Sequence, residues 1–431
     1  MTRRIVIVCD QASKAGGHAR VAIESAAALA RSGEKVTYFA SHGPIDDELI
    51  AAGVEIVLTG QPDVFEQSNR FLGAMRGIWN VKAKRVIARL AREKVSGGLV
   101  FHVHGWTKSL SPSVLSEIVA SPHPVICTLH EFFTVCPNGA FFNYRAQTNC
   151  ELTPMSRACA LTNCDSRSYE YKLLRLARQF VMERLARFPK AATSFIYTTE
   201  FSRNIISKFL PAEADYHYLP NPVAVRQVPQ VNAWKNSAFI YVGRLDVEKG
   251  IIPAAEILHR LGIPLEIAGI GRCAEGIRHV NPAAIFHDWL NTEQLNSFFE
   301  KARVLIFPSL WYETYGLAVS EALARGVPVI GSRDSAASER IIDGKNGKLF
   351  SWSNPGEFED AVSTAAGSTA VVEGWSRFGY VDYWKAPSTI ENHVAGLKHI
   401  YDRALRQRSS GRRQANAMAD VPSTSDDVPY A

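Results

Sequence analysis

The sequence has no long run of apolar residues. No stretch reaches the roughly 18 uncharged apolar residues that indicate a membrane-spanning helix, although 46% of its 431 residues are hydrophobic. Near the start, the apolar run of residues 5–9 ends at Asp10, which makes it too short for the core of a signal peptide. We therefore expect a globular, cytoplasmic protein that does not span a membrane.

Several short ligand-binding signatures are also missing. The sequence contains no Asp-x-Asp and no Cys-x2-Cys, and no Gly-x-Gly-x-x-Gly follows the first apolar run. The last absence argues against a nicotinamide-dependent dehydrogenase, whose fingerprint glycines let the backbone approach the pyrophosphate. The absence of Asp-x-Asp argues against a metal ion that bridges the protein and an anionic substrate.

Acidic residues are scarce in two windows. Residues 70–94 contain eight Lys or Arg against one acidic residue, and residues 165–190 contain seven against three, in a chain of net charge +6. We expect basic helices near 70–94 and 168–190, the first amphipathic with apolar residues such as Phe71 at helical spacing. Such helices suit an anionic membrane surface, and a solvated face over a core stripe is the alternative. Nucleic acid is not expected as a partner, because no basic-aromatic signature accompanies the charge.

Apolar runs alternate with helical patterns along most of the chain, which predicts parallel sheets built from βαβ units. The pattern occurs twice, so we expect the α/β class: two Rossmann-like, doubly wound domains facing each other across a cleft. The predicted strands are 4–10, 35–40, 55–58, 98–103, 124–129, 238–242, 265–268, 304–307 and 327–330. The predicted units are an N-terminal domain 1–220 with a cysteine-rich insertion at 131–168, a C-terminal domain 221–389, a closing helix 390–405 and a disordered tail 406–431.

The segment from Ile306 to Ile330 is the most informative. A strand is followed by a loop with Glu313, and a helix begins near Gly316 with Glu321 in its first two turns. The amides ahead of that helix would lack intrahelical partners and form a phosphate site: Thr314, Tyr315, Gly316 and Leu317. A carboxylate beside it suits the vicinal hydroxyls of a ribose or sugar.

Further candidates follow other predicted strands. Arg244 and Lys249 leave the strand 238–242 and would neutralise a diphosphate. The pair Gly16-Gly17 precedes another helix start, and His130 follows the strand 124–129. Ligands of doubly wound sheets bind beyond the carboxyl ends of the strands, so these residues are expected at the cleft.

Four of the seven cysteines are clustered in one window. They are Cys136, Cys150, Cys159 and Cys164, with 13, 8 and 4 residues between them. In a cytoplasmic chain this favours thiolate ligation over disulfides, and it predicts a structural zinc that holds the insertion beside the cleft. Buried or incidental thiols are the alternative.

These blocks together resemble the retaining glycosyltransferases of family 4, which have the GT-B fold. The resemblance covers about residues 4–405, and the Glu313-x7-Glu321 block is its most specific part. It implies donor-binding roles for residues in both domains: Gly16, Gly17, Gly243, Arg244, Lys249, Gly271, Thr314, Tyr315, Gly316, Leu317 and Glu321. It also implies that Glu313 and His130 act at the transferred sugar. The segments 334–339 and 287–289 depart from the family pattern, so the nucleotide base stays open.

The resemblance implies a metal-independent hexosyltransferase that needs no cofactor for catalysis and uses a nucleotide-diphosphate sugar as donor. We expect a lipid-linked or oligosaccharide acceptor in surface or exopolysaccharide biosynthesis, at the inner face of the cytoplasmic membrane. Two alternatives stay open at this point. One is a nucleotide-sugar epimerase on the same fold, and the other is a zinc-stabilised nucleic-acid-binding protein.

Overall fold

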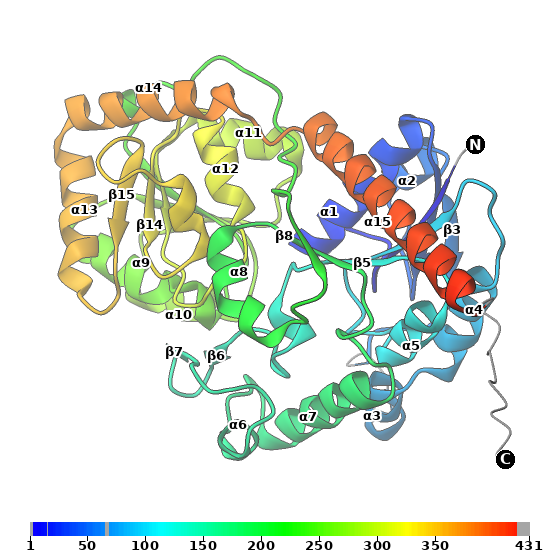
Figure 1. Cartoon of the computed structure of the whole chain (residues 1–431). Helices are drawn as coiled ribbons and strands as arrows, with labels where there is room; N and C mark the ends of the chain where they lie inside the picture. The colour runs from blue at the N-terminus through cyan, green and yellow to red at the C-terminus, as the bar shows by residue number, and fades with distance from the viewer. Residues whose placement is uncertain (1–2, 15, 65–68, 420–431) are drawn as a thin grey trace, which may run out of the picture.

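In the computed structural model, residues 3–14, 16–64 and 69–419 are described, with side chains up to residue 408. Two parallel sheets lie in separate halves of the molecule, each with helices packed around it (Figure 1). The first has the order β3-β2-β1-β4-β5-β8-β9 and the second the order β12-β11-β10-β13-β14-β15. The short strands β6 (Phe142–Asn143) and β7 (Thr148–Asn149) pair separately as a hairpin.

The strands of the first sheet are β1 (Arg4–Val8), β2 (Lys35–Ala40), β3 (Glu55–Leu58), β4 (Leu99–Val103), β5 (Val125–Thr128), β8 (Ser194–Tyr197) and β9 (Asp215–Tyr218). Those of the second are β10 (Ala238–Val242), β11 (Leu265–Ala268), β12 (Ile285–His287), β13 (Ala302–Phe307), β14 (Val329–Ser332) and β15 (Gly347–Phe350). Both predicted sheets are therefore present. The strands β8, β9, β12 and β15 were not predicted.

The helices of the first domain are α1 (Gly17–Arg31), α2 (Asp47–Ala51), α3 (Arg70–Ile78), α4 (Val81–Ala91), α5 (Pro112–Ala120), α6 (Arg157–Leu161), α7 (Tyr169–Arg184) and α8 (Glu200–Ile206). Those that follow are α9 (Ile251–Arg260), α10 (Ala274–Val280), α11 (Thr292–Glu300), α12 (Leu317–Leu323), α13 (Pro355–Gly367), α14 (Thr369–Lys385) and α15 (Ile390–Ala419).

The central strands are mostly apolar, as expected for sheets covered by helices on both faces. Strand β1 lies between β2 and β4, with Ile5 in register with Val36 and Val100, and all three are buried. Each sheet has its own core. The cores fix the positions of the loops that leave the carboxyl ends of the strands.

The predicted single helix across 70–94 is wrong. Two helices, α3 and α4, form instead, and they are separated at Trp79 and Asn80. The side chain of Asn80 accepts a hydrogen bond from the Ala83 amide at 3.1 Å and caps α4, so a new helix starts there.

The last helix, α15, crosses back to the first domain as predicted (Figure 1). Its residues Leu397, Ile400 and Tyr401 pack in the core with α1 and β1. It extends beyond the predicted end to Ala419, in keeping with the helix-forming Ala, Arg, Gln and Met residues of that segment. The rest of the predicted tail, 420–431, lies outside the described residues.

Candidate active site

An ion pair lies where the loops after β10 and β13 meet. Lys249 Nζ is 2.6 Å from Glu313 Oε2, and this carboxylate also accepts a hydrogen bond from Trp311 Nε1 at 3.1 Å. Burial alone would raise the pKa of Glu313, but the charge of Lys249 and these hydrogen bonds outweigh it and hold that pKa below its usual value. Glu313 is therefore ionised at neutral pH.

Arg244 lies on the same loop as Lys249, as the sequence predicts. Its guanidinium pairs with Asp246 and, at 3.3 Å, with Glu248. Half of its side chain is exposed, whereas Lys249 is largely buried. The two cations are thus unequal, and Lys249 is the one held in a fixed position.

The segment from Thr314 to Leu317 is held through its carbonyl groups. The Thr314 carbonyl accepts hydrogen bonds from Thr198 Oγ1 at 3.1 Å and Thr199 Oγ1 at 3.0 Å, and the carbonyls of Tyr315 and Gly316 accept from Arg340. In a trans peptide the C=O and the next N–H point in opposite directions. The amides of residues 315–317 therefore point away from these donors.

Gly316 makes this turn sterically feasible. Its φ is +81°, and a Cβ at this position would lie 2.8 Å from the ring of Phe307. Since α12 begins at Leu317, the preceding amides have no carbonyl partner within the helix. The loop therefore presents amides of the kind that the sequence predicts to bind a phosphate.

Glu321 lies on α12 and reaches the first domain. Its Oε1 is 3.0 Å from Nη1 of Arg20, which also pairs with Glu24 one turn further along α1. A Cβ on Gly17 would lie 3.9 Å from Leu317, so the starts of α1 and α12 face each other. The structure thus brings Glu321 together with Gly16 and Gly17, which precede Arg20.

His130 follows β5 at the same domain boundary. Its backbone carbonyl accepts a hydrogen bond from Thr314 Oγ1 at 2.6 Å, and its Nε2 lies 2.8 Å from His104 Nδ1. Burial, with a smaller contribution from neighbouring histidines, lowers the pKa of both rings well below the usual value. Both imidazoles are therefore neutral, and one donates a hydrogen bond to the other.

Two family models cover most of the chain. Residues 15–227 match the model described as Glycosyltransferase Family 4, and residues 236–367 match the model described as Glycosyl transferases group 1. The chain belongs to the family 4 glycosyltransferases. These matches bear out the resemblance based on the Glu313-x7-Glu321 block and its flanking loops.

Solved structures of this glycosyltransferase fold extend over nearly the whole chain. Sucrose-phosphate synthase from Thermosynechococcus elongatus superposes with a TM-score of 0.68 at 16% identity, over 94% of this chain and 100% of that one. Anabaena HepE in complex with UDP gives a TM-score of 0.62 at 13% identity, over 94% and 100%. The predicted two-domain GT-B architecture is confirmed.

Curated relatives match over shorter segments. The GDP-mannose-dependent alpha-mannosyltransferase of Corynebacterium glutamicum is 34% identical over 126 residues, which are 29% of this glycosyltransferase and 30% of that protein. The Sulfoquinovosyl transferase SQD2 of Arabidopsis thaliana is 30% identical over 127 residues, 29% of this chain and 25% of that one. Each match spans less than a third of the relative's length.

Two predicted donor glycines have structural roles in this glycosyltransferase. A Cβ on Gly271 would lie 2.4 Å from the carbonyl oxygen of Leu245, so this position admits only glycine. Gly243 has a φ of +153°, and a Cβ there would contact the Tyr241 ring. Both glycines therefore shape the loop that carries Arg244.

Two of the four clustered cysteines, Cys159 and Cys164, lie against Lys172 of α7. Lys172 Nζ lies 3.2 Å from Cys164 Sγ and 3.5 Å from Cys159 Sγ. Within the described ranges, no group of three or more His, Cys, Asp or Glu is arranged to hold a metal ion. The predicted zinc at Cys136, Cys150, Cys159 and Cys164 therefore receives no support from the structure.

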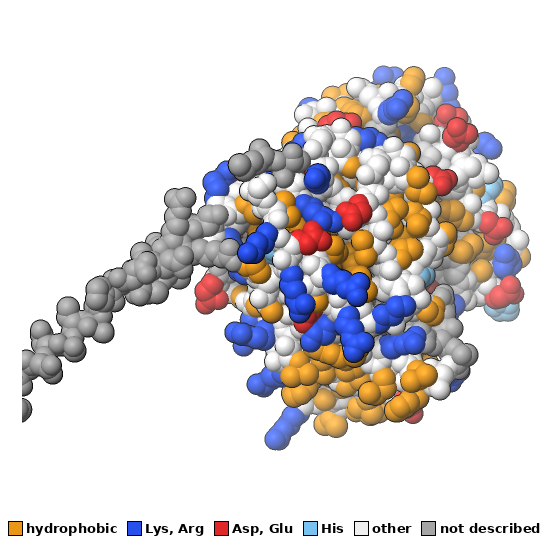
Figure 2. Space-filling model, turned by 90° about the vertical axis from the view of Figure 1, so that its right-hand side faces the viewer, with side chains coloured by type: hydrophobic (Ala, Val, Ile, Leu, Met, Phe, Trp, Pro, Cys, Tyr) orange, Lys and Arg blue, Asp and Glu red, His pale blue; other side chains and the backbone are white. Residues whose placement is uncertain are grey.

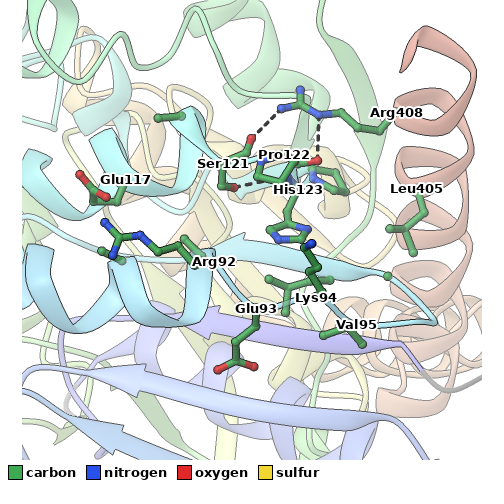
Figure 3. Close-up of a pocket in the computed structure, with 16 residues that line it drawn as sticks. Arg92, Glu93, Lys94, Val95, Glu117, Ser121, Pro122, His123, Leu405 and Arg408 are labelled. Carbon is green, nitrogen blue, oxygen red and sulfur yellow. Dashed lines mark hydrogen bonds between the residues drawn. The ribbon is translucent and has the colours of Figure 1, made fainter. Parts of the chain in front are cut away.

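Two cavities lie at opposite ends of the central strands of the first sheet, one at their carboxyl ends and one at their amino ends. A small one at the domain boundary is lined by His18, His104, His130 and Glu131, among others. A larger one, of about 670 Å³, lies between α4, α5 and α15, where Arg408 Nη2 donates a hydrogen bond to the Ser121 carbonyl at 3.0 Å (Figure 3). The residues predicted to bind the donor do not line this second cavity.

Sequence reasoning missed five contributors to the site. His104 carried a signal, because it directly follows an apolar strand just as His130 does. The others carried none: Arg20 pairs with a carboxylate 301 positions away, and Thr198, Thr199 and Arg340 act only through contacts with the loop 314–316.

Proposed function

We propose that this glycosyltransferase moves a hexose from a nucleotide-diphosphate sugar to an acceptor with retention of anomeric configuration and without a metal ion. The observation that carries the proposal is the ion pair of Lys249 with Glu313, next in sequence to the amides of residues 315–317 at the start of α12, the helix on which Glu321 lies. A fixed cation and oriented amides stabilise the negative charge that grows on a departing diphosphate.

In this proposal each group has one task. Lys249 and Arg244 meet the charge of the diphosphate, Glu321 accepts from the ribose hydroxyls, and Glu313 and His130 contact the sugar. The UDP named in the Anabaena HepE structure belongs to the class of leaving group proposed here. In this reaction the departing phosphate oxygen takes the proton of the acceptor hydroxyl, so that attack occurs on the face from which the diphosphate leaves.

A ligand screen tests the donor class. Since only a ligand of the folded state raises the melting temperature, one of UDP, GDP or ADP is expected to stabilise the protein, and the corresponding nucleotide-sugar is expected to release that diphosphate when acceptor is added. Conversion of donor to an isomer without acceptor would instead identify an epimerase. Stabilisation by none of the three diphosphates would contradict the proposed donor class.

We also propose that the acceptor is lipid-linked and is met at an anionic membrane surface. No helix within the described part of the chain is both long and apolar enough to span a bilayer. Exposed apolar side chains instead gather on α3 and α7, among them Phe71 and Met75 on α3 and Leu173 and Phe180 on α7. Figure 2 shows hydrophobic side chains at the lower end of one face, with Lys and Arg side chains directly above them.

Basic side chains also form a stripe on α4. Lys82, Arg85 and Arg89 are exposed and recur at helical spacing, and Arg92 continues the stripe to the rim of the cavity in Figure 3. An apolar patch beside a basic stripe fits the boundary between acyl chains and anionic headgroups.

Charge reversal tests this surface. The double variant Arg85→Glu/Arg89→Glu is expected to lower the fraction of protein that sediments with anionic vesicles, because about 1 kcal/mol of attraction is lost per basic residue near the surface. Zwitterionic vesicles and the matched double variant Arg377→Glu/Arg278→Glu, both in the second domain, are the controls. Equal sedimentation of the α4 variant and the wild type would show that the basic stripe of α4 is an ordinary solvated face.

A further inference from the structure

Lys172 is a buried cation held by sulfur atoms. Its side chain is 1% exposed, and Nζ is within hydrogen-bonding distance of Cys164 Sγ at 3.2 Å and Cys159 Sγ at 3.5 Å. The neighbouring carboxylate of Asp165 is paired with Arg175 at 2.7 Å. The lysine nitrogen therefore meets sulfur where a carboxylate would be the ordinary partner of a buried ammonium.

We propose that Lys172 and Cys164 are a modification site, at which oxidation joins Nζ to Sγ through one oxygen atom. With Lys172 counted as the ammonium, the balanced step is R–SH plus R′–NH3⁺ plus O2, giving R–S–O–NH–R′ plus H2O plus H⁺. The S–H bond and two N–H bonds break, S–O and O–N bonds form, and the second oxygen atom leaves as water. Molecular oxygen is the oxidant, and the sulfur and nitrogen atoms are oxidised.

The geometry favours this pair over the other thiols. Cys164 Sγ is the nearer of the two sulfurs to Nζ and also accepts a hydrogen bond from Asn138 Nδ2 at 3.7 Å, which orients it. Cys127 and Cys273 are buried elsewhere, in the cores of the first and second domains, so they serve as internal references. Small oxidants reach buried thiols through local openings of the chain.

The position of the bridge links it to the donor loop. Cys164 belongs to the insertion between β5 and α7, and the same insertion contacts the loop after β13, where Asn149 Nδ2 donates to the Leu310 carbonyl at 3.1 Å. Phe142 of the insertion packs with Trp311, the donor to Glu313. A covalent bridge would fix this insertion to the first turn of α7.

Peptide mass spectrometry of the whole protein, before and after exposure to oxygen, tests the proposal. The expected product is a cross-linked pair of peptides carrying Cys164 and Lys172, heavier by one oxygen and lighter by two hydrogens, which a thiol reductant reverses. Cys164→Ser and Lys172→Arg should abolish it, whereas Cys159→Ser and Cys273→Ser should leave it. The oxidised wild type should also melt at a higher temperature than the reduced protein, and Lys172→Arg should show no such difference.

Three outcomes would overturn the proposal. A product lighter by two hydrogens only, and still formed by Lys172→Arg, would be a disulfide between two of the cysteines. Stoichiometric zinc in the purified protein, with all four thiols unreactive, would instead support the predicted zinc site. An unchanged mass after oxidation would leave Lys172 with a packing role. None of these results depends on sugar transfer, so the bridge and the proposed function are tested independently of each other.

Discussion

Replacing Lys249 with alanine is expected to lower kcat/KM for the nucleotide-sugar by about 10²–10³-fold, the usual cost of losing one group that stabilises developing negative charge. The ammonium lies 2.6 Å from Glu313 and is largely buried, so water would replace it poorly. Steady-state kinetics with the donor found in the ligand screen measures the effect. The control is Lys301→Ala, which removes an exposed lysine of the same domain.

The same substitution changes how stability depends on pH. In the wild type the pKa of Glu313 is lowered, so the stability it contributes is present above its ordinary pKa and is lost as pH falls through the lowered value. Without Lys249, burial raises that pKa, and the variant should gain stability relative to the wild type as pH falls. Urea denaturation at neutral and mildly acid pH measures both trends, and parallel pH profiles would show that Lys249 does not hold the charge of Glu313.

Much of the fold could be predicted because it depends on local patterns. Apolar runs such as Arg4–Val8 and Leu99–Val103 form strands that are buried on both faces of a parallel sheet. Such strands can be predicted from their own residues, without knowing which distant segments pack against them. The edge strands β9 and β12 are half exposed and carry polar residues such as Asp215 and His287, so the same signal was weak there. The break between α3 and α4 was predictable from the capping residue Asn80, but the apolar spacing masked it.

The site was less predictable because its contacts join distant segments. The sequence indicates which loops follow strands, and it therefore placed Lys249, Glu313, Glu321 and His130 near one boundary. It does not indicate that Arg20 reaches Glu321. For the cysteines, the sequence did not indicate that Lys172 lies against Cys159 and Cys164, because Lys172 comes from a helix beyond the insertion.

Replacing Glu321 with glutamine is expected to weaken donor binding by about 10–100-fold, because a hydrogen bond to a charged group contributes about 1.5–3 kcal/mol. The amide keeps the shape of the side chain but loses one acceptor, so only one of two vicinal ribose hydroxyls would be satisfied. Calorimetric titration with the stabilising nucleoside diphosphate isolates this effect from chemistry at the sugar.

The variant Arg20→Ala shows whether weaker binding by Glu321→Gln comes from a lost ribose contact or from a lost contact between the domains. Arg20 pairs with Oε1 of Glu321 at 3.0 Å, so a ribose must compete with it for the carboxylate. Arg20→Ala removes the competitor and leaves Glu321 intact, and it should bind the diphosphate at least as tightly as the wild type. If Arg20→Ala and Glu321→Gln weakened binding equally, Glu321 would serve to hold the two domains together, and the ribose would have to be bound by another group.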